Sequence, residues 1–144
     1  MGRSRGGLTT KIHAVVNEHG LPLRFHLTPG QASDATPCKI LLQGLHPSQI
    51  VLADKAYDAD WIRDLIYEQG ATARTPPKSN RTKRSYTYDQ ELYKQRNLVE
   101  RFCGRLKKSF RSIATRYDKH STNFMAMIKI AAIRLWIEFY ESAA

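Results

Sequence analysis

The chain has 144 residues, of which 42% are apolar and 25% charged, a composition that suits a globular domain and argues against wholesale disorder. No apolar run approaches the roughly 18 residues of a membrane helix, and no apolar stretch of the signal-peptide kind follows the basic start of the chain. The net charge is +10, and we expect a cytoplasmic protein that has no membrane partner.

The first part of the chain is predicted to form a β-hairpin. Residues 1–7 are rich in glycine and arginine and are expected to form a loop. Strands are predicted over residues 10–17 and 21–28, the second with alternating apolar positions. The short connection between them contains a glycine, which indicates an antiparallel hairpin.

The remainder of the chain is predicted to alternate strands with helices. Strands are expected over residues 49–53 and 71–75, and the first is an apolar run of the kind found in buried strands. Helices are expected over residues 33–44, 59–69, 89–110 and 122–140, and a polar basic loop over residues 78–87. This order predicts a mixed α/β fold in which helices pack on a mixed sheet.

The excess positive charge is confined to one third of the chain. Residues 1–70 carry seven basic and seven acidic side chains, and residues 121–144 carry two of each. Residues 71–120 carry 14 basic and four acidic side chains. A confined basic segment indicates a polyanionic partner, although a solvated basic face would have the same composition.

Asp54 is the first residue whose position suggests chemistry. It directly follows the predicted strand 49–53, at the end where α/β folds place their functional groups. Buried strands also commonly end in an aspartate that forms a turn or caps a helix. Both interpretations fit this local pattern.

A row of polar side chains follows the predicted helix 89–110. At 100° per residue, Tyr93, Arg96, Glu100 and Lys107 lie within about 60° of one another, beside the apolar face. Glu100 can ligate a hard divalent cation, Arg96 and Lys107 can hold phosphates, and Tyr93 can stack on a base. A helix joined by i,i+4 ion pairs such as Arg96–Glu100 is the alternative.

Together these residues resemble a known family. The spacing Tyr93-x2-Arg96-x3-Glu100-x6-Lys107 resembles the Y-(2)-R-(3)-E-(6)-K signature of insertion-sequence transposases of the DDE type. Residues 52–58 resemble the second acidic block of that family. Residues 2–13, 30–34 and 111–119 resemble its insertion-sequence-five group, so the resemblance covers nearly the whole chain.

The resemblance implies an RNase H-like fold, a mixed sheet flanked by helices, with a site of three carboxylates. Asp54 would be the second carboxylate and Glu100 the third. The first carboxylate of the family is an aspartate on its central first strand, upstream of the segment that residues 2–11 resemble. Asp34 is not assigned this role, because it is interpreted as a helix N-cap. We therefore expect residues 1–144 to be a partial catalytic domain that lacks this strand, with an upstream transposase polypeptide supplying it.

The resemblance also implies the reaction and the partners. A bacterial DDE transposase cleaves DNA strands and transfers them in cut-and-paste transposition, using two Mg²⁺ or Mn²⁺ ions. Whether the isolated chain is an enzyme depends on the missing first aspartate, and the alternative is a catalytically inactive DNA-binding fragment or remnant. The implied partners are transposon-end and target DNA, in a nucleoid-associated homo-oligomer. The residues expected to bind DNA are Tyr93, Arg96, Lys107, Arg101, Arg105, Lys108, Arg81, Lys83 and Arg84.

Overall fold

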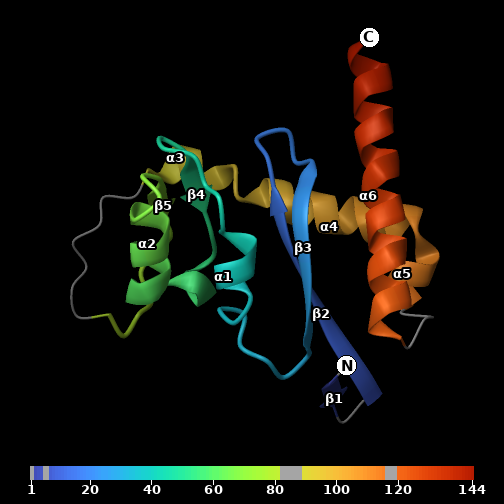
Figure 1. Ribbon diagram of the computed structural model, residues 1–144, viewed down its shortest axis with the longest axis horizontal. Helices are drawn as coiled ribbons and strands as arrows, with labels where there is room; N and C mark the ends of the chain where they lie inside the picture. The colour runs from blue at the N-terminus through green and yellow to red at the C-terminus, as the bar shows by residue number, and fades with distance from the viewer. Residues whose placement is uncertain (1, 5–6, 82–88, 116–119) are drawn as a thin grey trace. The chain divides into compact units, whose positions relative to one another are not determined.

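The computed structural model describes residues 2–4, 7–81, 89–115 and 120–144 (Figure 1). The chain divides into two compact units, one formed by Met1–Ala32 with Leu98–Ala144 and the other by Ser33–Asn97. We call them the hairpin unit and the central unit. Within the described residues, the strands form two separate sheets, one in each unit.

The hairpin unit contains an antiparallel sheet in the order β1-β2-β3, formed by Gly2–Ser4, Gly7–Val16 and Pro22–Pro29. The predicted hairpin is confirmed, with His13 opposite His26 in the β2–β3 register. The loop expected over residues 1–7 is wrong for Gly2–Ser4, which pairs with β2. Ladder hydrogen bonds use only backbone groups, so a segment rich in glycine and arginine can still form them.

The turn between β2 and β3 follows from its sequence. The Asn17 side-chain oxygen accepts hydrogen bonds from the backbone N–H groups of His19 and Leu21, each at 3.0 Å. Gly20 has a φ of +71°, a conformation that costs other residues energy. Asparagine and glycine therefore encode this turn locally.

Among the residues that the structure describes, the helices of the hairpin unit are α4 (Asn97–Ser109), α5 (Arg111–Thr115) and α6 (Ser121–Ala143). In Figure 1, α6 runs beside β3, with which it is in contact. Alternate residues of β2 share one face of the sheet, and Ile12, Ala14 and Val16 pack there against the buried core. The core residues are Phe102, Leu106, Ile113, Phe124, Ile128, Ala131 and Leu135.

The helix expected over residues 89–110 is wrong as a single element. The structure has α3 (Gln90–Lys94) and α4, separated by a turn at Gln95 and Arg96. The N–H groups of these two residues donate to carbonyls three residues earlier, a tighter pattern than the α-helical one. No glycine or proline marks this break. The last helix is confirmed and extends to Ala143, slightly further than predicted.

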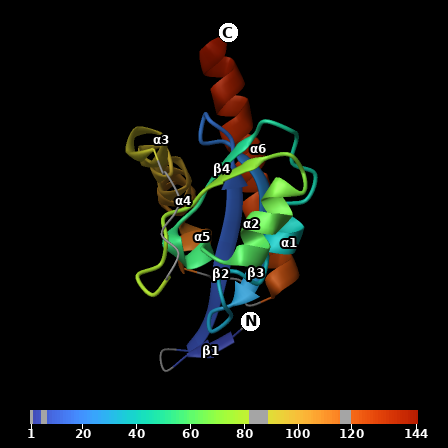
Figure 2. The ribbon, with the colours of Figure 1, turned by 90° about the vertical axis from the view of Figure 1, so that its left-hand side faces the viewer.

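The central unit contains a parallel pair of strands, β4 (Ile50–Leu52) and β5 (Thr72–Arg74). Its helices are α1 (Cys38–Leu41), the short 3₁₀ helix η1 (Lys55–Tyr57), α2 (Asp60–Tyr67) and α3. Figure 2 shows α1 beside α2, which it contacts. The core of this unit is Cys38, Leu42, Ile62, Ile66, Ala71 and Ala73.

Two predictions for this unit are wrong. The helix expected over residues 33–44 is only the short α1, and its N-cap is Pro37 and not Ser33 or Asp34. The residue before a proline is disfavoured from the helical region, which delays the helix start. The strand β4 is not buried, since Ile50 is exposed and the other two residues are half-buried. Within the described residues, β5 is its one hydrogen-bonded neighbour.

The mixed α/β class is confirmed, as are the strand at residues 71–75 and the helix at residues 59–69. The RNase H-like sheet and its missing first strand stay predictions. In the described parts of the chain, no helix is both long enough and apolar enough to span a membrane.

Candidate active site

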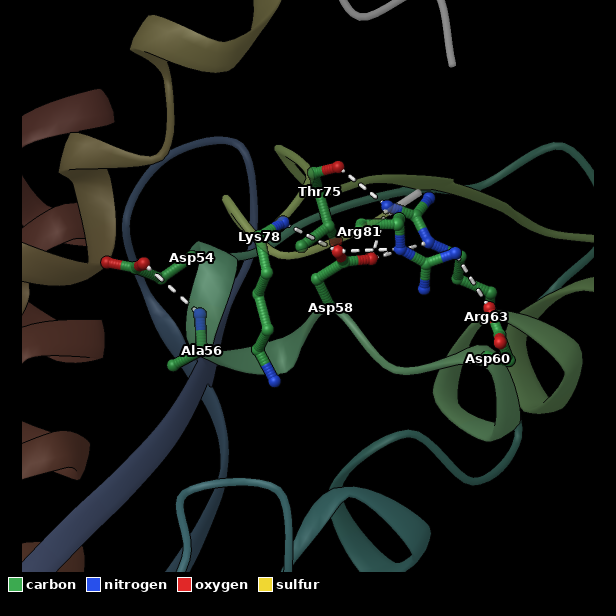
Figure 3. Close-up of polar contacts among 8 residues, drawn as sticks. All are labelled: Asp54, Ala56, Asp58, Asp60, Arg63, Thr75, Lys78 and Arg81. Carbon is green, nitrogen blue, oxygen red and sulfur yellow. Dashed lines mark hydrogen bonds and ion pairs between the residues drawn. The ribbon is translucent and has the colours of Figure 1, made fainter. Parts of the chain in front are cut away.

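Asp54 lies two residues beyond the end of β4 and forms the N-cap of η1. Its Oδ1 accepts a hydrogen bond from the Ala56 N–H at 3.4 Å, close to the limit for such a bond. The side chain is 47% exposed, and its carboxylate points away from the neighbouring polar cluster (Figure 3). Asp54 is therefore a capping residue whose carboxylate also remains accessible to a ligand.

Arg96 reaches the same carboxylate within the central unit. Its Nη1 lies 3.5 Å from Asp54 Oδ2, and its guanidinium lies over the Tyr93 ring at 5.6 Å from the centroid. An ion pair this long between partly exposed side chains contributes little to stability. The structure thus brings together three residues singled out from the sequence, Asp54, Tyr93 and Arg96.

Glu100 lies on α4, in the hairpin unit, and is exposed. It projects about 160° around the helix from the fully buried Phe102, so it faces away from the core of that unit. The row predicted from Tyr93 to Lys107 stays a prediction, because a turn divides its helix, with Tyr93 and Arg96 in the central unit and Glu100 and Lys107 in the hairpin unit. Within α4, Glu100 and Lys107 still share one face, two turns apart.

The other predicted DNA-binding residues have different surroundings. On α4, the cations Arg101, Arg105, Lys107 and Lys108 are all exposed. Arg105 also donates from Nη2 to the Gly20 carbonyl oxygen at 3.1 Å. The predicted residues Lys83 and Arg84 lie outside the described residues. No group of three or more His, Cys, Asp or Glu side chains placed to hold a metal ion occurs among the described residues.

Asp58, at the other end of η1, is a buried polar centre that the sequence analysis did not single out. Its side chain is 0% exposed, and both of its oxygens accept hydrogen bonds (Figure 3). Oδ1 accepts from Arg63 Nε at 3.0 Å and Nη2 at 2.9 Å, and Oδ2 accepts from the Lys78 N–H at 2.8 Å and Arg81 Nε at 2.9 Å. A carboxylate occupied in this way is structural.

The two arginines that pair with Asp58 also bond to other groups of the protein. Arg63, only 4% exposed, also donates to the Thr75 carbonyl oxygen at 2.8 Å. Arg81, 15% exposed, also pairs with Asp60 at 2.8 Å. Burial by itself would raise the pKa of Asp58, but hydrogen bonds from the Lys78 N–H, Arg63 and Arg81 outweigh it and hold the pKa below its ordinary value.

Comparison with known proteins decides the family. Residues 2–136 match the family described as Transposase DDE domain. The chain belongs to the DDE transposase family. The family assigned from the residue spacing is therefore confirmed, and membership supports a function in DNA transposition.

Two relatives show how the DDE family chains differ in length. A candidate transposase for insertion sequence element IS6501 from Brucella ovis is 43% identical over 132 residues, which is 90% of this chain and 99% of that protein. The transposase for insertion sequence element IS1106 from Neisseria meningitidis serogroup B is 28% identical over 130 residues, 85% of this chain but 41% of that protein. No solved structure matches the chain significantly.

Proposed function

We propose that the chain supplies two carboxylates, Asp54 and Glu100, to a metal-dependent site that cleaves and transfers DNA strands in transposition. The observation that carries the proposal is the contrast between two neighbouring aspartates. Asp58 is buried and fully hydrogen-bonded, whereas Asp54 is 47% exposed and has contacts of 3.4 and 3.5 Å. Only Asp54 can take a new ligand without breaking a buried network.

The residues fit a hard divalent cation. Carboxylate oxygens are the ligands that Mg²⁺ and Mn²⁺ prefer, and the long contacts of Asp54 cost little to give up. A bound pair of such ions would supply positive charge to the attacking and leaving oxygens of the phosphoryl transfer. Glu100 is proposed as the second ligand from this chain.

The neighbouring side chains are proposed to hold DNA. Arg96 now pairs with Asp54, and its planar guanidinium suits bidentate binding to a phosphate once that carboxylate has another partner. The Tyr93 ring beneath it limits where the guanidinium can lie. The exposed α4 cations Arg101, Arg105, Lys107 and Lys108 are proposed to contact the DNA backbone, together with Lys83 and Arg84.

The third carboxylate is proposed to come from a transposase segment outside residues 1–144. Two findings support this proposal: no three-residue metal group occurs among the described residues, and the Neisseria relative is more than twice as long as its matched part. The same segment would add the first strand of an RNase H-like sheet. Assembly as a homo-oligomer on DNA is part of this proposal.

Metal binding can be tested without an activity assay. Mn²⁺ titration followed by electron paramagnetic resonance compares the wild-type chain with Asp54→Asn and Glu100→Gln. Each variant is expected to weaken Mn²⁺ binding by about tenfold or more, whereas Asp64→Asn, which alters an exposed carboxylate on α2, is expected to leave it unchanged. Wild-type Mn²⁺ affinity in the Asp54 variant would refute the assigned ligand.

A second candidate function, a catalytically inactive DNA-binding fragment, is favoured by the lack of a three-residue metal group among the described residues. Nicking of supercoiled plasmid DNA with Mg²⁺ or Mn²⁺ separates the two functions. The catalytic proposal expects nicking when the chain is assayed together with the upstream transposase polypeptide that supplies the third carboxylate, and it expects Glu100→Gln to abolish that nicking. DNA binding that survives EDTA, without nicking in either metal when that polypeptide is present, supports the inactive fragment.

A further inference from the structure

Asp54 and Asp58 occupy opposite ends of one short helix. Asp54 is the N-cap of η1 and Asp58 is its C-cap. The Asp58 end is anchored, because its buried side chain pairs with Arg63 on α2. A turn of three residues anchored at one end leaves the other end little freedom, so Asp58 restrains the backbone that carries the proposed metal ligand.

The same carboxylate also holds the segment that follows β5. Asp58 Oδ2 accepts from the backbone N–H of Lys78 at 2.8 Å and from Arg81 Nε at 2.9 Å. These residues lie 20 and 23 positions further along the chain, at the start of the basic third of the sequence. One buried side chain thus connects η1, α2 and residues 78–81 (Figure 3).

Arg81 has few donors left for another partner. Its Nε is used by Asp58 and its Nη1 by Asp60, and the side chain is only 15% exposed. A phosphate contact needs guanidinium donors that face solvent. This geometry suits a link within the protein better than a direct DNA contact.

We propose that Asp58 is a positioning residue, which uses Arg81 and the Lys78 N–H to hold residues 78–81 against the turn that carries Asp54. This inference rests on the proposed function, because its consequence is that DNA bound by the basic third of the chain meets the metal-binding carboxylate. Arg81 then acts as a tether, and its loss would disturb DNA binding through geometry as well as through charge.

Charge and geometry predict opposite effects for one substitution. Asp58→Asn and Asp60→Asn each remove one negative charge beside Arg81. Electrostatics alone predicts that both variants bind DNA more tightly, since added positive charge strengthens phosphate binding. The role of Arg81 as a tether predicts that Asp58→Asn binds DNA more weakly. Asp60→Asn leaves the Asp58 network intact and serves as the matched control.

The test measures affinity for a fluorescent double-stranded oligonucleotide at fixed salt by anisotropy, with circular dichroism as the check of folding. Asp58→Asn is expected to weaken binding about fivefold or more, and Asp60→Asn to leave it equal or tighter. A folded Asp58→Asn variant that binds as tightly as Asp60→Asn would overturn the proposal.

A second pair covers the case in which Asp58→Asn does not fold. Arg81→Gln and Lys78→Gln each remove one positive charge from the same segment. Only Arg81→Gln breaks the tether, because Lys78 is held through its backbone, and the buried Asp58–Arg63 pair survives in both. Arg81→Gln is expected to bind DNA more weakly than Lys78→Gln, and equal affinities would overturn the proposal.

Limited trypsin digestion tests the tether without DNA. Cleavage after Lys78 is expected to be faster in Arg81→Gln and Asp58→Asn than in wild type or Asp60→Asn, since restrained backbone resists proteolysis. Unchanged cleavage in both tether variants would overturn the tether itself. A wild-type chain that binds no DNA would instead refute the proposed function.

Discussion

Arg63→Met should strongly destabilise the central unit. Methionine has an unbranched side chain of similar length but no hydrogen-bond donor. The substitution therefore removes both hydrogen bonds from Arg63 to Asp58 Oδ1, at 3.0 and 2.9 Å, and the bond to the Thr75 carbonyl oxygen at 2.8 Å. Asp58 would then keep its charge in a site that is 0% exposed, with only Lys78 and Arg81 as donors.

The magnitude follows from burial. Breaking a buried pair by removing one partner costs about 3–5 kcal/mol, because here the buried Asp58 carboxylate loses two of its four hydrogen bonds and one of its two cationic partners. With a urea dependence of about 2 kcal/mol per molar, the unfolding midpoint should fall by about 1.5–2.5 M. The matched control is Lys94→Met, which breaks an even shorter pair with Glu91, at 2.6 Å, in the same unit. Those side chains are 68% and 80% exposed, so about 0.2–1 kcal/mol is expected.

Each unit contains one tryptophan, so tryptophan fluorescence can follow the unfolding of one unit at a time. Trp61 lies on α2 in the central unit, and Trp136 lies on α6 in the hairpin unit. In a Trp136→Phe background, urea unfolding followed by fluorescence reports on Trp61 alone. The reference is the same background without the Arg63 substitution.

A midpoint shift below about 0.5 M with an unchanged slope would refute this reasoning. The double variant Asp58→Asn with Arg63→Met refines the test, because it leaves no buried charge unpaired at this position. It should be less destabilised than the sum of the single variants. Additive losses would show that the two side chains do not act as a pair.

Further outcomes follow from single positions. Phe102→Ala, at a fully buried site in the hairpin unit, should cost about 3–5 kcal/mol in urea unfolding. Gly70→Ala should cost about 1–2 kcal/mol, because Gly70 has a φ of +78° and a Cβ there would lie 3.3 Å from Pro47. Gly104→Ala should raise stability by about 0.5–1 kcal/mol, since a Cβ meets nothing within 4 Å, and a concurrent loss of DNA affinity would indicate that DNA approaches this helix. Ionised Asp58 has a lowered pKa, so its stabilisation is present above the unfolded pKa of about 3.9 and is lost as the pH falls through the lower folded value, which acid unfolding monitored at Trp61 should show.

Local signals predicted much of the secondary structure. Asn17 and Gly20 encode the hairpin turn, and Gly70, with its positive φ, follows the end of α2 as expected of a helix terminator. These features depend on dihedral preferences and hydrogen bonds within a few residues. The break at Gln95 and Arg96 carried no such signal, because both residues are good helix formers, and the single helix predicted across it was therefore wrong.

By itself, the sequence determined the family, through the spacing of Tyr93, Arg96, Glu100 and Lys107, and it placed Asp54 at the end of a strand. It did not distinguish Asp54 from Asp58, two aspartates that flank the same three-residue helix. Only the tertiary structure decided that Asp58 is buried and that Asp54 is accessible. The physical reason is that a charge can be buried only where enough donors converge on it, and those of Asp58 come from residues 5, 20 and 23 positions away.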